Sequence, residues 1–240
     1  MGFLSALFKP RHRPLSASLP PALFPTNVQD CTFPVNAWAS SIQDLPSNEA
    51  CRVRRIMQCK SRSGAHEEFL VVYVRHPSGR DAIVLADRDV SLDASAPSST
   101  RSRDRIRLLA DGTAASLTRS VPGGYAKIHT VKFPESGAPS VAHLAVLLTV
   151  VQRHGMAPGA SAGVQSGWFA YCVAEVMREV FLGKGKTGKG WVRVPYAGMK
   201  VEGRDTVGAL IREFTSTWED FVRRQPRGDE VRVWSVDVRT

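Results

Sequence analysis

The chain has 240 residues, a formal net charge of +10 at pH 7 and 43% hydrophobic residues, which is enough for a continuous core. No stretch approaches the roughly 20 uninterrupted apolar residues of a membrane-spanning helix. The first residues carry their basic cluster after an apolar run, the reverse of a secretory signal. The positive charge favours acidic partners, but the basic residues are scattered and form no specific nucleic-acid motif.

Residues 1–48 are rich in Pro and Ser and show no sustained hydrophobic period. We therefore expect an N-terminal arm that is partly disordered. Its apolar start, followed by basic residues, could touch an anionic membrane, although such a segment is also typical of a disordered leader. Regular structure is expected from Cys51 onward, within a single α+β domain at residues 49–240.

The first half of this domain predicts antiparallel strands. Residues 51–59 alternate β-branched and basic side chains, and residues 66–88 have the pattern of a hairpin that turns at His76-Pro77-Ser78-Gly79. Further strands are expected at residues 104–110 and 125–133. Between the hairpin and these strands, residues 91–103 are small and polar and predict a mobile surface loop.

The hydrophobic period then changes to that of helices. Residues 140–155 form an amphipathic pattern with Ser140 as the N-cap, and residues 163–181 and 206–225 predict two more helices. A last strand is plausible near the C-terminus, in the stretch DEVRVWSVDVRT. The order predicts an α+β fold in which antiparallel strands pack against two or three helices.

Neither the cysteines nor the glycine-rich loop indicates a cofactor. The four cysteines have no CxxC spacing and no histidines at zinc-finger distances, so we expect no metal site and reduced thiols in an intracellular, cytoplasmic protein. The loop GKGKTGKG superficially resembles a phosphate-binding P-loop, but its last Lys is followed by Gly and the segment leaves a helix. A flexible basic loop is expected, whose Lys184, Lys186 and Lys189 could contact an acidic partner or an anionic lipid surface.

The stretch GVQSGWFAYCVAEVMREVF poses the main functional question. Ser166 stands where the helical pattern begins, so it is either an N-cap residue or a nucleophile position. Among the histidines, His66 and His129 belong to strands, from which either could point into a cleft as a general base; packing alone also explains a histidine there. Cys172 lies on another side of the helix from Ser166 and is expected to be a buried thiol.

Two segments in this order carry a family resemblance. The stretch AHEEFLVVYVRHPSGRDAIVLADR resembles the catalytic His hairpin, and VQSGWFAYCVAEVM the nucleophile helix, of the permuted papain-like fold of lecithin:retinol acyltransferase-like proteins. The order is also similar to that of a group of uncharacterised fungal proteins. The resemblance covers about residues 51–182. It implies that His66 is the general base and Ser166 the nucleophile, with Asp87 as the best candidate for the group that orients the base.

Two residues depart from the family pattern, since Ser166 replaces the expected Cys and Gln165 the preceding Asn. A helix N-terminus and a His can bring the pKa of a thiol below neutrality, whereas a serine hydroxyl stays protonated and needs strong general-base assistance. The chain is then a relative that has lost catalysis, a serine enzyme on a thiol scaffold, or a protein in which Cys was deliberately changed to Ser.

Three functions follow as hypotheses. The leading one is a catalytically weakened or inactive papain-like protein that acts as a binding or interaction module. An acyltransferase or amide/ester hydrolase would use Ser166 with His66, and backbone amides near residues 166–168 would stabilise the oxyanion. A basic membrane-surface or nucleic-acid-associated protein would instead use the lysines of the glycine-rich loop and the apolar N-terminal segment.

Overall fold

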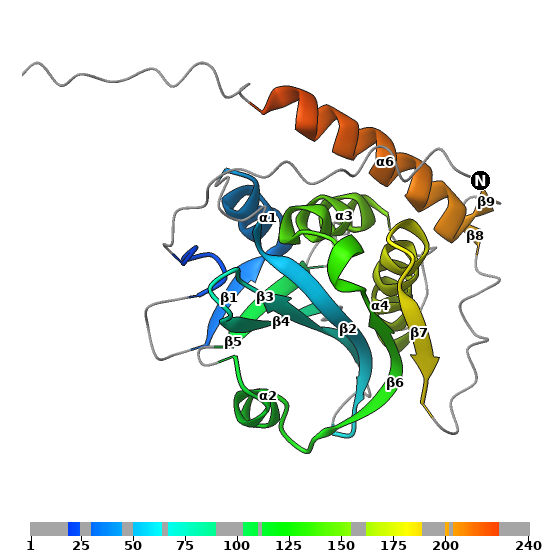
Figure 1. Ribbon diagram of the computed structural model, residues 1–240. Helices are drawn as coiled ribbons and strands as arrows, with labels where there is room; N and C mark the ends of the chain where they lie inside the picture. Colours follow the sequence, from blue (N-terminus) through cyan, green and yellow to red (C-terminus); the bar gives the residue numbers. More distant parts are fainter. Residues whose placement is uncertain are drawn as a thin grey trace, which may run out of the picture.

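The computed structural model describes residues 19–24, 30–44, 50–63, 67–89, 103–109, 112–154, 162–188, 200–201 and 204–225. These residues form an α+β fold, in which helices pack on both faces of a seven-stranded antiparallel sheet (Figure 1).

The sheet has the strand order β1-β5-β4-β3-β2-β6-β7. Its strands are β1 (Cys31–Pro34), β2 (Arg52–Ser61), β3 (Glu68–Arg75), β4 (Asp81–Asp89), β5 (Arg103–Leu109), β6 (Tyr125–Lys132) and β7 (Lys184–Thr187). Strands β2 to β5 are consecutive in the chain and form a meander, while β6 returns to pair with β2 and β1 pairs with β5. Short β8 (Lys200–Val201) and β9 (Arg204–Asp205) form a separate ribbon.

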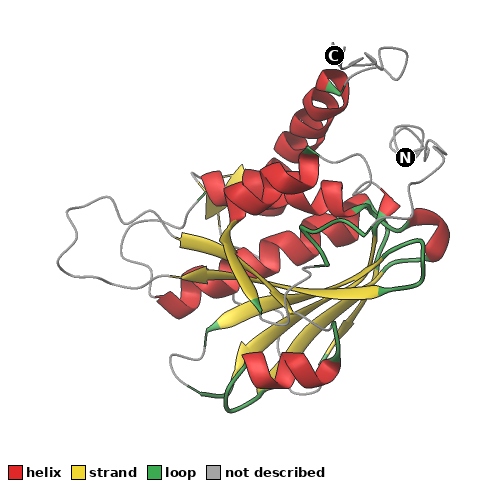
Figure 2. Cartoon of the chain, turned by 90° about the vertical axis from the view of Figure 1, so that its left-hand side faces the viewer, coloured by secondary structure: helices red, strands yellow, loops and turns green. Residues whose placement is uncertain are grey.

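The helices lie in layers around the sheet. They are α1 (Val35–Gln43), α2 (Ala114–Ser120), α3 (Val141–Arg153), α4 (Ala162–Val180) and α6 (Thr206–Arg224), with a 3-10 turn at Glu135–Gly137. Helices α1, α3 and α4 pack on one face, which we call the covered face, and α6 crosses outside α3 and α4 (Figure 1). The other face, which we call the open face, carries α2 (Figure 2).

Side chains alternate between two hydrophobic cores, as the two-residue period of a strand requires. On β4, Val84 and Ala86 belong to the large core under α1, α3 and α4. Ile83 and Leu85 belong to the smaller core on the open face, where Leu117 of α2 joins them. This alternation determines which polar side chains can meet.

The predicted α+β fold is confirmed, and the expected strands and helices between residues 51 and 225 lie close to the observed ones. The hairpin turns where expected, with Gly79 at a φ of 86°. Ser140 caps α3 as predicted: its hydroxyl accepts from the backbone N–H of His143, whose Nδ1 accepts from the Ser140 N–H. This reciprocal pair is a capping box with histidine at the third position.

Regular structure begins earlier than the expected Cys51. Part of the predicted N-terminal arm forms β1 and α1, and α1 buries Val35, Trp38 and Ile42 in the large core. The helix was missed because it is short and starts directly after Pro34, without a side-chain cap. Its apolar spacing is the signal that could have revealed it.

The basic glycine-rich segment is partly a strand, because Lys184–Thr187 pairs with β6 as β7. Two glycines permit this close approach. A Cβ on Gly183 would lie 2.5 Å from Val131 Cγ1, and one on Gly185 would lie 2.9 Å from the His129 ring. The absence of large side chains therefore serves packing on β6, instead of the flexibility that we expected.

Helix α4 begins at Ala162, so Ser166 lies inside the helix and is not its N-cap, which corrects that interpretation. Several expectations fall outside the described residues. These are the loop from residue 91 to 102, the last strand, Lys189 and His66.

Candidate functional site

The hydroxyl of Ser166 is buried between α4 and the beginning of β3. The residue is 0% exposed. Its Oγ donates a hydrogen bond to the Gly163 carbonyl at 3.2 Å and accepts one from the Glu68 backbone N–H at 3.1 Å. The hydroxyl proton is thus engaged within the helix, and an oxygen lone pair satisfies a buried backbone donor.

This position within the helix also affects the amides expected to stabilise an oxyanion. Only about the first four N–H groups of an α-helix lack an intrahelical acceptor. Because α4 starts at Ala162, the N–H groups of residues 166–168 lie beyond that turn. They are held by the helix and are not free donors for an oxyanion.

Of the two residues predicted to act with Ser166, the structure describes Asp87 but not His66. His66 lies outside the described residues, so its assignment as a base stays a prediction. The contact from Ser166 to Glu68 brings the serine to the strand that begins two positions after His66. The structure therefore places the serine near the expected part of the chain, but it does not show a base there.

Asp87 is not brought to Ser166, which corrects its assignment as the orienting group. Its carboxylate faces the open side of the sheet, where it pairs with Arg105 at 3.0 Å and Arg107 at 3.3 Å. Its neighbour Arg88 is the β4 residue that faces α4. Because adjacent residues of a strand point to opposite faces, Asp87 and Ser166 lie on different sides of the sheet.

A buried ion pair joins β4 to β5 on the covered face, next to Asp87 in the sequence. Arg88 binds Asp104 through two hydrogen bonds of 2.7 and 2.8 Å, and both side chains are 0% exposed. The guanidinium also donates to the Val151 carbonyl, and it lies 5.2 and 5.1 Å from the ring centres of Trp168 and Phe169. Burial raises the pKa of Asp104, an effect opposed by the hydrogen bond from Arg88. The Arg88 guanidinium is thus enclosed by a carboxylate, a carbonyl and two aromatic rings of α4.

Further polar residues continue across the covered face beneath α4. Gln58 Nε2 donates to Glu68 Oε2 at 2.7 Å, and His129 lies beside Gln58 on the neighbouring strand. His129 Nε2 is 3.6 Å from Glu175 Oε1 of α4. Both side chains of that pair are nearly fully buried, so His129 faces the sheet–helix contact and not a cleft.

We did not single out Gln58, Glu68 or Glu175 from the sequence. The signal that could have found them is a polar residue at a position where the strand or helix period demands an apolar one. The histidine–carboxylate pair is able to exchange a proton in principle, but its burial gives a substrate no access. The 3.6 Å separation is longer than a hydrogen bond, so the structure shows a buried polar contact between His129 Nε2 and Glu175 and no hydrogen bond between them.

The three buried thiols, Cys51, Cys59 and Cys172, offer no replacement nucleophile. All four cysteines are free. Burial raises the pKa of Cys172, and raises the pKa of Cys51 and Cys59 to about 12. A thiol at such a pKa is almost entirely protonated at pH 7 and unreactive. The expectation that Cys172 is a buried thiol is confirmed.

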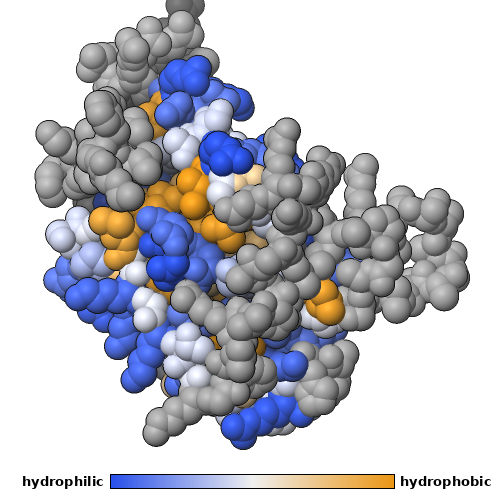
Figure 3. Space-filling view, turned by 90° about the vertical axis from the view of Figure 1, so that its right-hand side faces the viewer, coloured by the Kyte–Doolittle hydropathy of each residue, from blue (hydrophilic) through white to orange (hydrophobic). Residues whose placement is uncertain are grey.

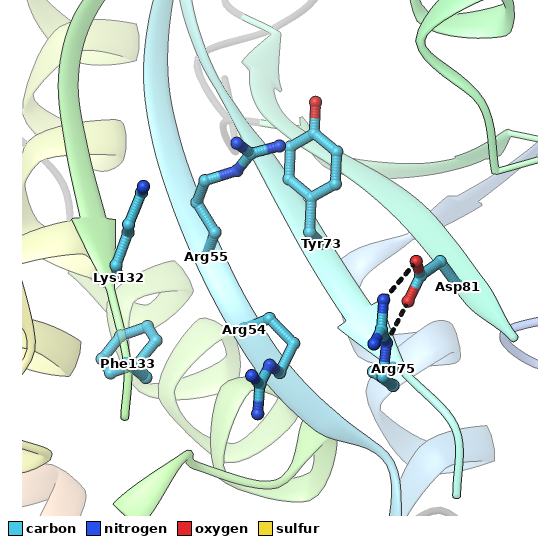
Figure 4. A pocket seen from close by; sticks show the side chains of 7 residues that line it. All are labelled: Arg54, Arg55, Tyr73, Arg75, Asp81, Lys132 and Phe133. Carbon is cyan, nitrogen blue, oxygen red and sulfur yellow. Dashed lines mark hydrogen bonds and ion pairs between the residues drawn. The ribbon is translucent and has the colours of Figure 1, made fainter. Parts of the chain in front are cut away.

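A second candidate site is a hollow of about 340 Å³ at the end of the strands β2, β3 and β6 (Figure 4). It is lined by Arg54, Arg55, Tyr73, Arg75, Asp81, Lys132 and Phe133. Arg55 lies over the Tyr73 ring, 3.8 Å from its centre, in a cation–π contact. Unlike the polar groups under α4, this hollow opens to solvent and carries excess positive charge.

The lysines of the glycine-rich segment lie at the edge of the sheet. Lys184 and Lys186 are exposed on β7, on a side of the molecule where apolar and hydrophilic areas alternate (Figure 3). Leu182, 77% exposed, precedes this strand. The two lysines remain accessible to an acidic partner, but β7 presents them on an edge strand instead of a free loop.

Comparison with family models, with curated proteins and with solved structures gives no match for this chain. Within the described residues, no group of three His, Cys, Asp or Glu side chains is placed to hold a metal ion. None of the described helices combines the length and the apolar character needed to cross a bilayer.

Proposed function

We propose that this chain is a permuted papain-like protein that is catalytically inactive at the nucleophile position and acts as a binding or interaction module. The observation that carries the proposal is the state of the Ser166 hydroxyl, which is 0% exposed and engaged as both donor and acceptor. A serine nucleophile needs access to the substrate and a base that takes its proton. Here the proton is directed to Gly163, within the same helix.

Two further features support an inactive site. Asp87 pairs with arginines on the open face. Arg88, the next residue of β4, points to the covered face, where its charge is neutralised by Asp104. A cationic group held in a buried ion pair cannot take the part of a neutral or acidic residue that orients a histidine base.

Ester hydrolysis tests this proposal directly. The full chain, Ser166→Ala and His66→Ala are compared on p-nitrophenyl acetate at neutral pH. We expect the same slow background rate for all three proteins, because the serine hydroxyl is inaccessible. Turnover by the unmodified chain that both substitutions abolish would contradict the proposal and establish a serine enzyme.

The acyltransferase or amide/ester hydrolase remains the second candidate. It is favoured by one contact, the hydrogen bond from the Glu68 backbone to Ser166, which brings the serine to the start of the strand that follows His66. For catalysis, the serine would have to leave the Gly163 carbonyl and become exposed. A covalent acyl adduct on Ser166, detected by mass spectrometry after incubation with the ester, is the result that this alternative requires.

A basic membrane-surface or nucleic-acid-associated protein is the third hypothesis. Lys184 and Lys186 are exposed and support it, while the described residues place no other basic group on β7. Binding through scattered lysines depends steeply on salt because it releases counterions. Oligonucleotide or anionic vesicle binding that persists at high salt would reject this hypothesis.

A further inference from the structure

The basic hollow on β2, β3 and β6 arises from an irregularity in the sheet. In the pairing of β2 with β3, Val53 opposes Val74 and Arg55 opposes Tyr73, so that Arg54 is an extra residue in a β-bulge. A bulge breaks the strict alternation of side chains and redirects those beside it. It allows two consecutive arginines, Arg54 and Arg55, to line one hollow.

Two of the four cations in the hollow are held by carboxylates. Arg75 binds Asp81 through two hydrogen bonds of 2.7 and 2.8 Å across the β3–β4 hairpin. Arg54 binds Glu135 at 2.6 Å. These pairs fix the rim of the hollow and balance part of its charge.

The other two cations, Arg55 and Lys132, have no ion-pair partner among the residues that the structure describes. They are directly opposite each other on β2 and β6, and Figure 4 shows Arg55 reaching to Tyr73 with Lys132 on the neighbouring strand. Arg55 Nε is buried, with no hydrogen-bond partner in the same part of the chain. The residue as a whole is partly exposed and lines the hollow, so an anionic ligand there can contact its side chain.

The charge and size of the hollow indicate the class of ligand. Four cations and the two carboxylates of Asp81 and Glu135 leave a net charge of +2. A phosphate monoester carries nearly the same charge with opposite sign at neutral pH. The volume of about 340 Å³ lies at the lower end of the range for small-ligand sites.

We propose that this hollow binds a phosphate monoester group, with Arg55 and Lys132 as its principal ligands. Arg55 lies over the Tyr73 ring, with its Cζ 3.8 Å from the ring centre, so its guanidinium is already oriented and loses little freedom on binding. Lys132 adds a flexible charge from the neighbouring strand. This inference gives a ligand class to the binding role in the proposed function, but the hollow lies apart from Ser166.

The test measures binding of inorganic phosphate to the full chain by isothermal titration calorimetry, at constant ionic strength. The variants are Lys132→Gln and Arg55→Gln, and the matched control is Lys127→Gln, which removes the same charge from an exposed position on the same strand outside the hollow. We expect saturable binding that the first two variants weaken about tenfold or more and that the control leaves within about twofold.

Absence of saturable phosphate binding, or equal weakening by Lys127→Gln and Lys132→Gln, would overturn the site. So would an oligonucleotide that binds more tightly than phosphate and is equally sensitive to both lysines, because this indicates a diffuse nucleic-acid surface. Circular dichroism checks that the variants are folded. A negative result for phosphate binding does not bear on the proposal that Ser166 is inactive, since ester hydrolysis tests that proposal separately.

Vesicles identify the source of the phosphate group. The chain is sedimented with phosphatidylcholine vesicles, with and without phosphatidylinositol phosphate. Sedimentation that needs the phosphorylated lipid and is lost in Lys132→Gln assigns a lipid headgroup. Phosphate binding without sedimentation assigns a soluble phosphate ester, and both results support the site.

Discussion

A buried ion pair on the covered face of the sheet and the basic hollow on the open face differ in how their charged groups are balanced. On the covered face, Arg88 and Asp104 satisfy each other at 0% exposure, and the Ser166 hydroxyl is used in two internal hydrogen bonds. On the open face, Arg55 and Lys132 meet solvent beside a hollow with excess positive charge. Buried polar groups that are mutually satisfied stabilise a fold, whereas accessible groups with unbalanced charge can bind a ligand. The covered face thus uses these polar groups inside the fold, and the hollow on the open face is where we propose that a ligand binds.

The largest effect is expected where a buried ion pair loses one partner. Asp104→Ala leaves the Arg88 guanidinium buried without its carboxylate and should lower the free energy of unfolding by about 3–5 kcal/mol. Asp81→Ala breaks the exposed pair with Arg75 and should cost less than about 1 kcal/mol. Urea unfolding of both variants compares the faces directly, and similar losses would show that burial does not distinguish them.

Low pH should lower the free energy of unfolding through His143, which lies in α3 on the covered face. Burial lowers the pKa of this histidine to about 3, and its neutral Nδ1 accepts from the Ser140 N–H in the capping box. The unfolded chain, with the ordinary pKa near 6.5, then binds more protons than the folded chain between these two values. Stability from His143 is present above pH 6.5 and is lost as the pH falls, by roughly 4 kcal/mol at pH 3.5.

His143→Gln is the control for this pH effect, because glutamine can keep the capping box but does not titrate. The variant loses the stacking of His143 on Trp218, whose ring centre is 3.7 Å away, and should be less stable at pH 7. Its disadvantage should shrink as the pH falls from 6.5 to 3.5 in denaturant unfolding experiments. A gap independent of pH would mean that His143 is not held neutral.

A smaller loss is expected at Ser166. Ser166→Ala removes the acceptor of the Glu68 backbone N–H and should cost about 1–3 kcal/mol, the usual penalty of an unsatisfied buried donor. Thr149→Ala on α3 is a suitable comparison, because the Thr149 hydroxyl donates within its own helix and receives no hydrogen bond from a strand among the described contacts. Equal decreases in the urea midpoint for the two variants would show that the hydrogen bond between Ser166 and the Glu68 N–H does not stabilise the fold.

Much of the fold followed from the sequence, because β2 to β6 and α3 have strong local periods and turn signals. The edge strand β7 was missed since its glycines serve contacts to Val131 and His129, which are far away in the chain. Helix α1 was missed because burial against the rest of the core, and not a cap, supports it. Local patterns thus predicted elements wherever local interactions dominate.

The sites were harder to predict, because they depend on strand register. Asp87 was chosen by its place in the hairpin, but the pairing of Phe69 with Asp87 places this carboxylate on the open face. One residue along the strand reverses the face. The basic hollow likewise depends on a bulge at Arg54 and on the return of β6 beside β2, neither of which a local pattern reveals.

Thiol labelling of Ser166→Cys tests the central claim most directly. The variant is treated with iodoacetamide at pH 7, and peptide mass spectrometry follows residue 166 separately from the natural cysteines and from free cysteine in solution. We predict labelling much slower than that of free cysteine, because the site is 0% exposed and lies inside α4, beyond its first turn. Labelling much faster than free cysteine would reveal an accessible thiolate and contradict the account of an inactive site.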